Sequence, residues 1–251
     1  MSSYDDAFFT YVNRSALRSA RRMLPILLQQ IPVDSVLDVG CGQGAWLAVW
    51  KELGVRQILG VDGSYVDTNR LLIATESFVA RDLREGFDLG HRFSIVQSLE
   101  VAEHLPESSA APLVESLVRH GDLVLFSAAP KGQGGDHHFN EQDYEYWRGH
   151  FSRHGYVPID FLRRRLIADR EIAPWYRYNT LLYATATVFD RLPMDLRAQR
   201  VPTGERIEDV SPPMYRLRKR VTQLLPVAIA TRLAKIKERS TITLAAMRQR
   251  R

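Results

Sequence analysis

The sequence has a single cysteine, Cys41, and no long run of apolar residues. One thiol excludes an intramolecular disulfide and any zinc site built from several thiolates. No apolar stretch approaches the roughly 20 residues that span a bilayer. The first residues include two acids and lack a basic region followed by an apolar one, so no secretory signal is expected and a cytoplasmic location is predicted.

Acidic residues are nearly absent from the C-terminal part of the chain. Residues 211–251 hold eleven Lys and Arg and one acid, whereas the other 210 residues hold 23 bases and 28 acids. The net charge of +5 therefore combines a tail of +10 with a body of −5. A basic body that binds nucleic acid is not indicated.

The remaining composition, 45% hydrophobic and 25% charged, is typical of a folded globular protein and excludes a disordered or collagen-like chain. Short apolar runs alternate with amphipathic segments, as in α/β proteins with a largely parallel sheet. The predicted strands lie at 35–40, 57–62, 77–82, 93–98, 122–127, 156–167 and 180–189, with helices at 44–54 and 111–121. A loop that includes Trp175, Tyr176 and Arg177 separates the last two strands and is a candidate lining of an acceptor pocket.

The chain is expected to contain one domain, residues 1–190, that opens with a helical N-terminal lead over 1–30. Four apolar residues lie near one stripe of this lead: Phe8, Tyr11, Leu17 and Leu24. Polar, proline-bearing residues 191–213 are predicted to be a linker. In the aromatic segment before residue 152, Trp147 and Phe151 are expected in the core.

Residues 214–251 are predicted to form a basic amphipathic helical tail that is interrupted at Pro226. Apolar residues recur at helical spacing on both sides of this proline: Leu217, Val221, Leu224 and Leu225 before it, and Ile229, Leu233 and Ile236 after it. The tail is expected to pack on the body or on a partner subunit, to contact an anionic membrane, or to bind nucleic acid.

The strongest local motif is the turn at 38–44, Asp-Val-Gly-Cys-Gly-Gln-Gly, between a predicted strand and a predicted helix. Such a turn lets the backbone approach a ligand and leaves the first N–H groups of the helix free to donate. The turn also satisfies G-x-G-x-x-A, so an NAD(P)-dependent reductase is an alternative. Asp38, however, would repel a pyrophosphate and suits a ligand with an ammonium group, while Asp62 is placed to accept the hydroxyls of a ribose.

The sequence VLDVGCGQGAWLAVWKELGVRQILGVDGS resembles the class I S-adenosylmethionine-dependent methyltransferases, whose first motif is an acid followed by G-x-G-x-G. The resemblance implies a Rossmann-like seven-stranded sheet of order 3-2-1-4-5-7-6 and S-adenosylmethionine as cofactor. It implies that the cofactor contacts Asp38, Gly40, Cys41, Gly42 and Gly44 at its amino-acid part, Asp62 and Gly63 at the ribose, Asp82 and Leu83 at the adenine, and Ser98, Leu99 and Glu100 at the end of the pocket. For Asp82, a solvated ion pair with Arg81 or Arg84 is the alternative.

A second cluster follows the predicted fourth strand, where ligands bind in open α/β sheets. Glu100, Glu103 and His104 share one face if this segment is helical. A run with His137 and His138 follows the predicted fifth strand on the same rim. We expect His104, with Glu103, to be catalytic. The structural alternative is that Glu100 and Glu103 are acids in the first turn of a helix, where the helix dipole favours negative charge.

The pattern E-x-x-E-H with a later D-H-x-F is similar to the metal-dependent 2′-O-methyltransferases of small RNAs, and E-x-x-E-H is also found in methyltransferases of ubiquinone synthesis. The resemblance implies that Glu100, Glu103, His104 and His137 bind a divalent metal. This chain departs from the RNA enzymes at Leu105, where they have a second His, and by the inserted KGQGGD. The negative body also argues against RNA.

The sequence therefore predicts an S-adenosylmethionine-dependent methyltransferase that acts on a hydroxyl of a small molecule or saccharide. His104 is expected to remove the proton of the acceptor without a metal. The alternatives are a metal-dependent RNA 2′-O-methyltransferase, an NAD(P)-dependent reductase, and a non-catalytic scaffold that binds the cofactor.

Overall fold

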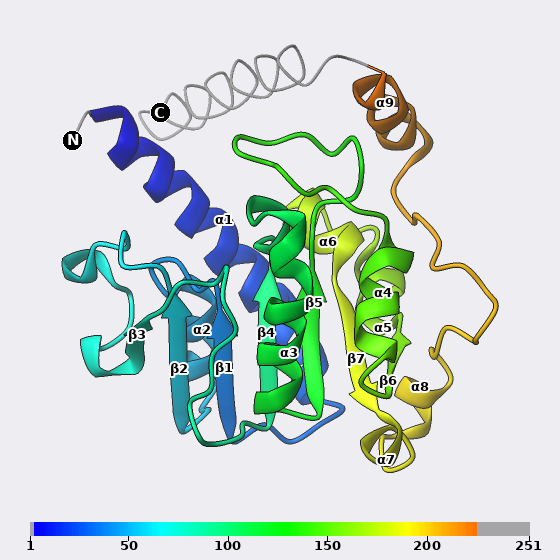
Figure 1. Cartoon of the computed structure of the whole chain (residues 1–251), viewed down its shortest axis with the longest axis horizontal. Coiled ribbons are helices and arrows are strands. Elements are labelled where there is room, and N and C mark those ends of the chain that lie inside the picture. Colours follow the sequence, from blue (N-terminus) through cyan, green and yellow to red (C-terminus); the bar gives the residue numbers. More distant parts are fainter. Residues whose placement is uncertain (1–2, 225–251) are drawn as a thin grey trace.

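The computed structural model describes residues 3–224, with side chains from Tyr11 onward. Seven strands form one sheet in this part of the chain (Figure 1). They are β1 (Ser35–Val39), β2 (Gln57–Asp62), β3 (Phe78–Ala80), β4 (Ile95–Leu99), β5 (Leu123–Ser127), β6 (Tyr156–Ile159) and β7 (Leu181–Thr185). Their order, β3-β2-β1-β4-β5-β7-β6, with β7 antiparallel to both neighbours, confirms the predicted sheet.

Helices cover both faces of the sheet. The described helices are α1 (Ser3–Leu28), α2 (Ala45–Glu52), α3 (Ala110–His120), α4 (Tyr144–Ser152), α5 (Phe161–Leu166), α6 (Pro174–Asn179), α7 (Ala186–Phe189), α8 (Met194–Arg197) and α9 (Pro213–Gln223). Alternate strand residues enter opposite cores: Val36 packs with α1, α2, α5 and α6, whereas Leu37 packs with α3 and α4. Parallel strands covered on both faces are almost entirely apolar, which explains their short continuous hydrophobic runs.

The N-terminal lead is a helix as predicted, with Leu24 fully buried and Leu17 packed at the edge of the core. The side chain of Phe8 lies outside the described part of the structure. Trp147 and Phe151 are buried in the core, as expected.

Three predictions of secondary structure near the end of the domain were wrong in part. The predicted strand at 156–167 is β6 followed by α5, because Asp160 ends the strand and accepts two hydrogen bonds from the guanidinium of Arg163 one helical turn later. The predicted strand at 180–189 ends at Thr185, whose hydroxyl accepts from the Val188 N–H and begins α7. The predicted loop at 175–179 is α6, which Pro174 begins.

The C-terminal part of the described chain packs against the body. Leu196 of α8 is fully buried, and Arg200 pairs with Ile159 of β6, so the segment predicted as a linker contacts the sheet. The tail begins with α9, which lies beside the long loop after β5 (Figure 1). The predicted second tail helix, after Pro226, lies outside the described residues. Among residues 3–224, no helix is long and apolar enough to cross a membrane.

Candidate active site

The glycine turn between β1 and α2 lines a cleft of about 730 Å³ at the carboxyl ends of the strands. Gly40, Gly42 and Gly44 all have positive φ, and Gly44 begins α2 in the left-handed conformation. A Cβ on Gly40 would lie 2.3 Å from Val101, so this glycine allows close packing. A Cβ on Gly42 would meet no atom within 4 Å, so the Gly42 backbone faces open space in the cleft.

Asp62 ends β2 and holds the glycine turn in place. Its carboxylate accepts from the N–H groups of Gly42 and Gly63, each at 2.7 Å, and from the hydroxyl of Tyr65 at 2.5 Å. Asp62 lines the cleft and is only 4% exposed. Two backbone N–H groups and the Tyr65 hydroxyl therefore hold the carboxylate. A hydroxyl group of a ligand is able to take the place of the Tyr65 hydroxyl.

Asp38 and Cys41 lie beneath the cleft rather than on its wall. Burial raises the pKa of Asp38 to about 7, and the charge of Asp62 adds to this shift. Burial also raises the pKa of the Cys41 thiol, so this cysteine is not an activated nucleophile. A cation close to Asp38 would lower this pKa and keep the carboxyl group ionised. Such behaviour is expected of a carboxyl group that binds an ammonium.

The two residues predicted to border the adenine both line the cleft. Leu83 is buried, whereas Asp82 is exposed and forms an ion pair with Arg84 at 2.5 Å. Arg84 lowers the pKa of Asp82 to about 2. The ion pair that the sequence left as an alternative is therefore present, at a position that still borders the cleft.

Ser98 and Leu99, at the end of β4, are buried below the cleft wall. The Ser98 hydroxyl is fully enclosed and has no hydrogen-bond partner among the described residues. Gly63 lines the cleft, and the ring of Tyr65 occupies the space that a Cβ on Gly63 would need.

Glu100 has a left-handed backbone, with φ of 58°, immediately after β4. Its N–H donates to the Ser127 carbonyl oxygen at 3.0 Å, and its carboxylate accepts from Gln133 at 2.7 Å and from Asn179 at 3.1 Å. Burial raises the pKa of Glu100, while these donors oppose the increase. This turn separates Glu100 from the short 3-10 turn Ala102–His104, so the predicted shared helical face does not form.

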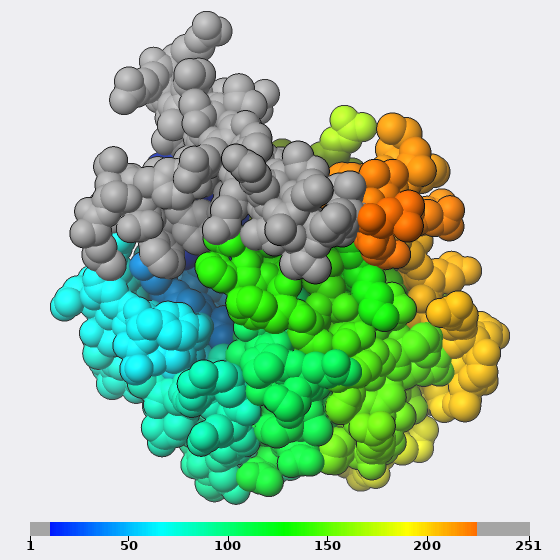
Figure 2. Space-filling model, turned by 45° about the horizontal axis from the view of Figure 1, so that its top comes forward, coloured from blue at the N-terminus to red at the C-terminus, as the bar shows by residue number. Residues whose placement is uncertain are grey.

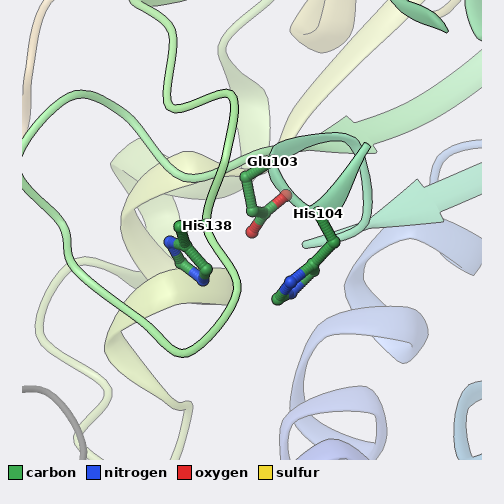
Figure 3. Close-up of side chains that lie close together, drawn as sticks. All are labelled: Glu103, His104 and His138. Atoms are coloured by element: carbon green, nitrogen blue, oxygen red, sulfur yellow. The ribbon is translucent and has the colours of Figure 1, made fainter. Parts of the chain in front are cut away.

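Glu103, His104 and His138 point toward one another on the same rim (Figure 3). One potential ligand atom from each lies within 4.8 Å of the others. The imidazole rings of His104 and His138 have centroids 4.8 Å apart and are nearly perpendicular. His137, which the sequence placed in this cluster, has positive φ and a 70% exposed side chain, and its ring lies 3.6 Å from Asp136.

The electrostatics of this cluster are unusual. Both carboxylate oxygens of Glu103 are buried without a hydrogen-bond partner in the described chain. Burial raises the pKa of Glu103 well above its ordinary value, and the charge of Glu100 adds to the increase. Although His104 as a residue is exposed, desolvation of its ring lowers its pKa to about 4, with a contribution from His138. His104 is therefore neutral at physiological pH, which leaves its ring free to bind a metal, and the lowered pKa makes it a weaker base than an ordinary histidine.

Hydrogen bonds orient both imidazoles. The Nδ1 atom of His104 lies 3.2 Å from the carbonyl oxygen of His137, and Nδ1 of His138 lies 2.8 Å from Glu141. The Glu141 carboxylate also accepts from the N–H groups of Gly132 and Gly134, which fixes the loop. In each ring Nε2 takes no part in these bonds, an arrangement that suits a base or a metal ligand.

Several residues that shape this site were not predicted from the sequence. They are Tyr65 on Asp62, Gln133 and Asn179 on Glu100, and Glu141 on His138. Gln133 lies in the inserted KGQGGD, at which the sequence departs from the methyltransferases of small RNAs. Trp175, Tyr176 and Arg177 were proposed to line an acceptor pocket. Tyr176 and Arg177 are instead buried in α6, and Trp175 is partly buried against the core.

The residues fit an S-adenosyl cofactor. The open side of Gly42, the carboxylate of Asp62 and a cleft of ordinary ligand size provide space and polar groups. The donor set of Glu103, His104 and His138 also fits a divalent metal, because mixed carboxylate and imidazole ligands suit Mn, Fe or Zn.

Comparisons with known proteins agree with this geometry. A family described as "Methyltransferase domain" matches residues 8–168. DesVI from Streptomyces venezuelae has a similar structure, with 15% identity, a TM-score of 0.57 and coverage of 74% of this chain and all of that one. The sugar N-methyltransferase KedS8 from Streptoalloteichus sp. has 16% identity, a TM-score of 0.55 and coverage of 73% and 93%. No curated protein matches this chain significantly in sequence. On the evidence of the family match and the sheet, the chain belongs to the class I S-adenosylmethionine-dependent methyltransferases, with S-adenosylmethionine as cofactor.

Proposed function

We propose that this enzyme transfers the methyl group of S-adenosylmethionine to a hydroxyl of a saccharide or another small molecule. The observation that carries the proposal is the position of His104, which lines the cofactor cleft and whose ring is oriented through Nδ1. A hydroxyl acceptor must lose its proton as the new bond forms, and a neutral imidazole at that edge supplies the base. A sugar N-methyltransferase shares the fold, so the fold accommodates a sugar acceptor.

In the proposed cofactor site, Asp38 lies nearest the amino-acid part, Asp62 binds the ribose, and Asp82 with Leu83 borders the adenine. Gly42 and Gly63 provide backbone surface without side chains. Displacement at carbon then needs alignment more than any further chemistry. The acceptor oxygen forms a bond to the methyl carbon as the carbon–sulfur bond breaks, and the acceptor proton passes to His104.

A divalent metal is a second candidate for how the acceptor is activated, and the buried, unpartnered carboxylate of Glu103 favours it. Glu103, His104 and His138 would hold the ion, which would lower the pKa of a bound hydroxyl. In that arrangement Glu141 would keep Nδ1 of His138 engaged, as carboxylates do beside metal-bound imidazoles.

The test is transfer of a labelled methyl group from S-adenosylmethionine to a panel of sugars, nucleotide sugars and short RNA duplexes. Label in a saccharide hydroxyl supports the proposal, and label in RNA 2′-hydroxyls contradicts it. Each assay is repeated after chelation and after addition of Mn²⁺ or Mg²⁺. If activity survives chelation, His104 removes the proton without a metal. If activity is lost on chelation and restored by added metal, the cluster binds a cation.

A further inference from the structure

The first helix of the tail, α9, is fixed to the body by its polar face. Lys219 is only 5% exposed and forms an ion pair with Asp209 at 2.5 Å. Arg218 donates to the Gln133 carbonyl oxygen at 2.5 Å, and Gln223 donates to the Lys131 carbonyl oxygen at 2.7 Å. These bonds orient the helix on the loop after β5.

The contact between α9 and this loop is also close at the backbone. A Cβ on Gly132 would lie only 2.2 Å from the Lys219 carbonyl oxygen. The rings of Tyr215 and Tyr178 lie 5.5 Å apart and add a contact to α6. Side-chain contacts and close backbone packing therefore both determine which side of α9 faces the body.

The apolar stripe of α9 faces away from the body. Met214, Leu217, Val221 and Leu224 recur every three or four residues and are 76%, 54%, 51% and 85% exposed. A helix that packs on a protein body normally buries its apolar stripe and exposes its charges. In α9 a lysine is buried and the apolar stripe is exposed, which is typical of an interaction surface. Figure 2 shows α9, in orange, at the surface of the molecule.

Charge identifies the partner. Arg216 and Arg220 are exposed on α9, and residues 225–251 add seven Lys and Arg with one acid. An anionic lipid surface attracts such residues and accepts apolar side chains between its headgroups. Nucleic acid would satisfy the charges but gain nothing from the apolar stripe, and a second basic tail would repel the first.

We propose that the exposed face of α9, the stripe Met214, Leu217, Val221 and Leu224 flanked by Arg216 and Arg220, docks on an anionic membrane surface. The helix lies in the plane of the interface and does not span the bilayer. Because α9 is fixed to the loop after β5 through Gln133, docking brings this loop close to the lipid surface. This inference does not depend on the identity of the methyl acceptor.

Cosedimentation of the full chain with vesicles tests the proposal. We expect binding to vesicles of phosphatidylglycerol mixed with phosphatidylcholine, weak binding to phosphatidylcholine alone, and weaker binding at high salt. The combined substitution Leu217→Ser, Val221→Ser and Leu224→Ser should lower the partition coefficient about tenfold or more. Met194→Ser, which changes a 74% exposed methionine on α8, is the matched control and should leave binding unchanged.

Thermal melts of each variant confirm that an exposed substitution has left the fold intact. Equal binding to neutral and anionic vesicles, or no binding to either, would overturn the proposal. Unchanged binding of the triple variant would also overturn it, because the tail charges alone would then be sufficient. A dimer that dissociates in the triple variant, measured by light scattering without lipid, would assign the stripe to a second copy of the chain.

Discussion

Two buried carboxylates on the same edge of the sheet differ sharply in their surroundings. Asp62 accepts hydrogen bonds from Gly42, Gly63 and Tyr65, whereas the Glu103 carboxylate accepts none from the described chain. The proposed cofactor half of the site is thus organised by the fold itself. The proposed acceptor half contains a carboxyl group that is costly to bury and that only a proton, a cation or a bound group satisfies.

This difference suggests a division between residues that bind the cofactor and residues that take part in methyl transfer. Groups around Asp62 are expected to control cofactor affinity, and groups around Glu103 are expected to control turnover. Polar groups left unsatisfied in a fold commonly mark functional sites.

Gly42→Val should abolish measurable binding of S-adenosylhomocysteine, because the new side chain occupies open space in the cleft. Titration calorimetry measures the affinity. Gly54→Val is the matched control, since Gly54 also has positive φ and an open Cβ position but does not line the cleft. Normal binding by Gly42→Val would contradict the proposed loop geometry.

His104→Ala should lower kcat by about 10²- to 10⁴-fold, the usual loss when a general base is removed. Cofactor affinity should change little, because the Asp62 side of the cleft is untouched. If a metal is bound, Glu103→Ala should be as damaging as His104→Ala, since either change opens the ligand set. Without a metal Glu103→Ala should be mild, and elemental analysis of the purified protein distinguishes the cases.

Asp62→Ala should weaken the binding of S-adenosylhomocysteine by about 1–3 kcal/mol, because ribose hydroxyls lose a charged acceptor. Tyr65→Phe leaves the carboxylate in place and serves as the comparison, so it should retain or improve affinity. Affinity unchanged in Asp62→Ala would locate the cofactor elsewhere. Calorimetric titration of both variants under one set of conditions decides.

Glu103→Met should stabilise the metal-free protein by about 1–2 kcal/mol while it impairs turnover, because an apolar side chain of similar size replaces an unpartnered buried carboxyl. Urea unfolding with and without chelator measures the change in the free energy of unfolding. Loss of stability in the metal-free variant would mean that Glu103 has partners in solution, and the comparison with Asp62 would fail.

Asp38 should make cofactor binding depend on pH. Its pKa is raised to about 7, and a bound ammonium lowers the pKa, so binding at pH 7 should release up to about half a proton. Affinity should therefore increase as pH rises through 7 and level off above it. Calorimetry in buffers of different ionisation enthalpy detects the released proton, and Asp38→Asn should remove the effect.

The first strands and the glycine turn could be predicted from the sequence because their signals are local, whereas the strand order followed from the resemblance to the methyltransferase family. Short apolar runs, a glycine-rich turn and an acid after the next strand occur in one continuous segment of about 30 residues. The segment 156–167 was wrongly predicted to be a single strand because its apolar residues hide the change from strand spacing to helical spacing. The buried pair of Asp160 and Arg163 that marks this change has no distinct local pattern.

The arrangement of the proposed acceptor half was harder to predict from the sequence because contacts between residues far apart in the chain determine it. The left-handed turn at Glu100 takes its carboxylate to Gln133 and Asn179 and away from the face of His104. The choice between His137 and His138 depends on Glu141, which fixes the loop by two backbone bonds and one imidazole bond. Adjacent histidines in a sequence do not show which one the loop turns inward.

Calorimetric titration of the purified chain with S-adenosylhomocysteine and, separately, with NADH shows most directly which ligand the cleft binds. We expect one S-adenosylhomocysteine per chain, binding that Gly42→Val removes, and no binding of NADH. Tight binding of NADH without binding of S-adenosylhomocysteine would contradict the assignment of the cleft between Gly42 and Asp62 to the methyl donor.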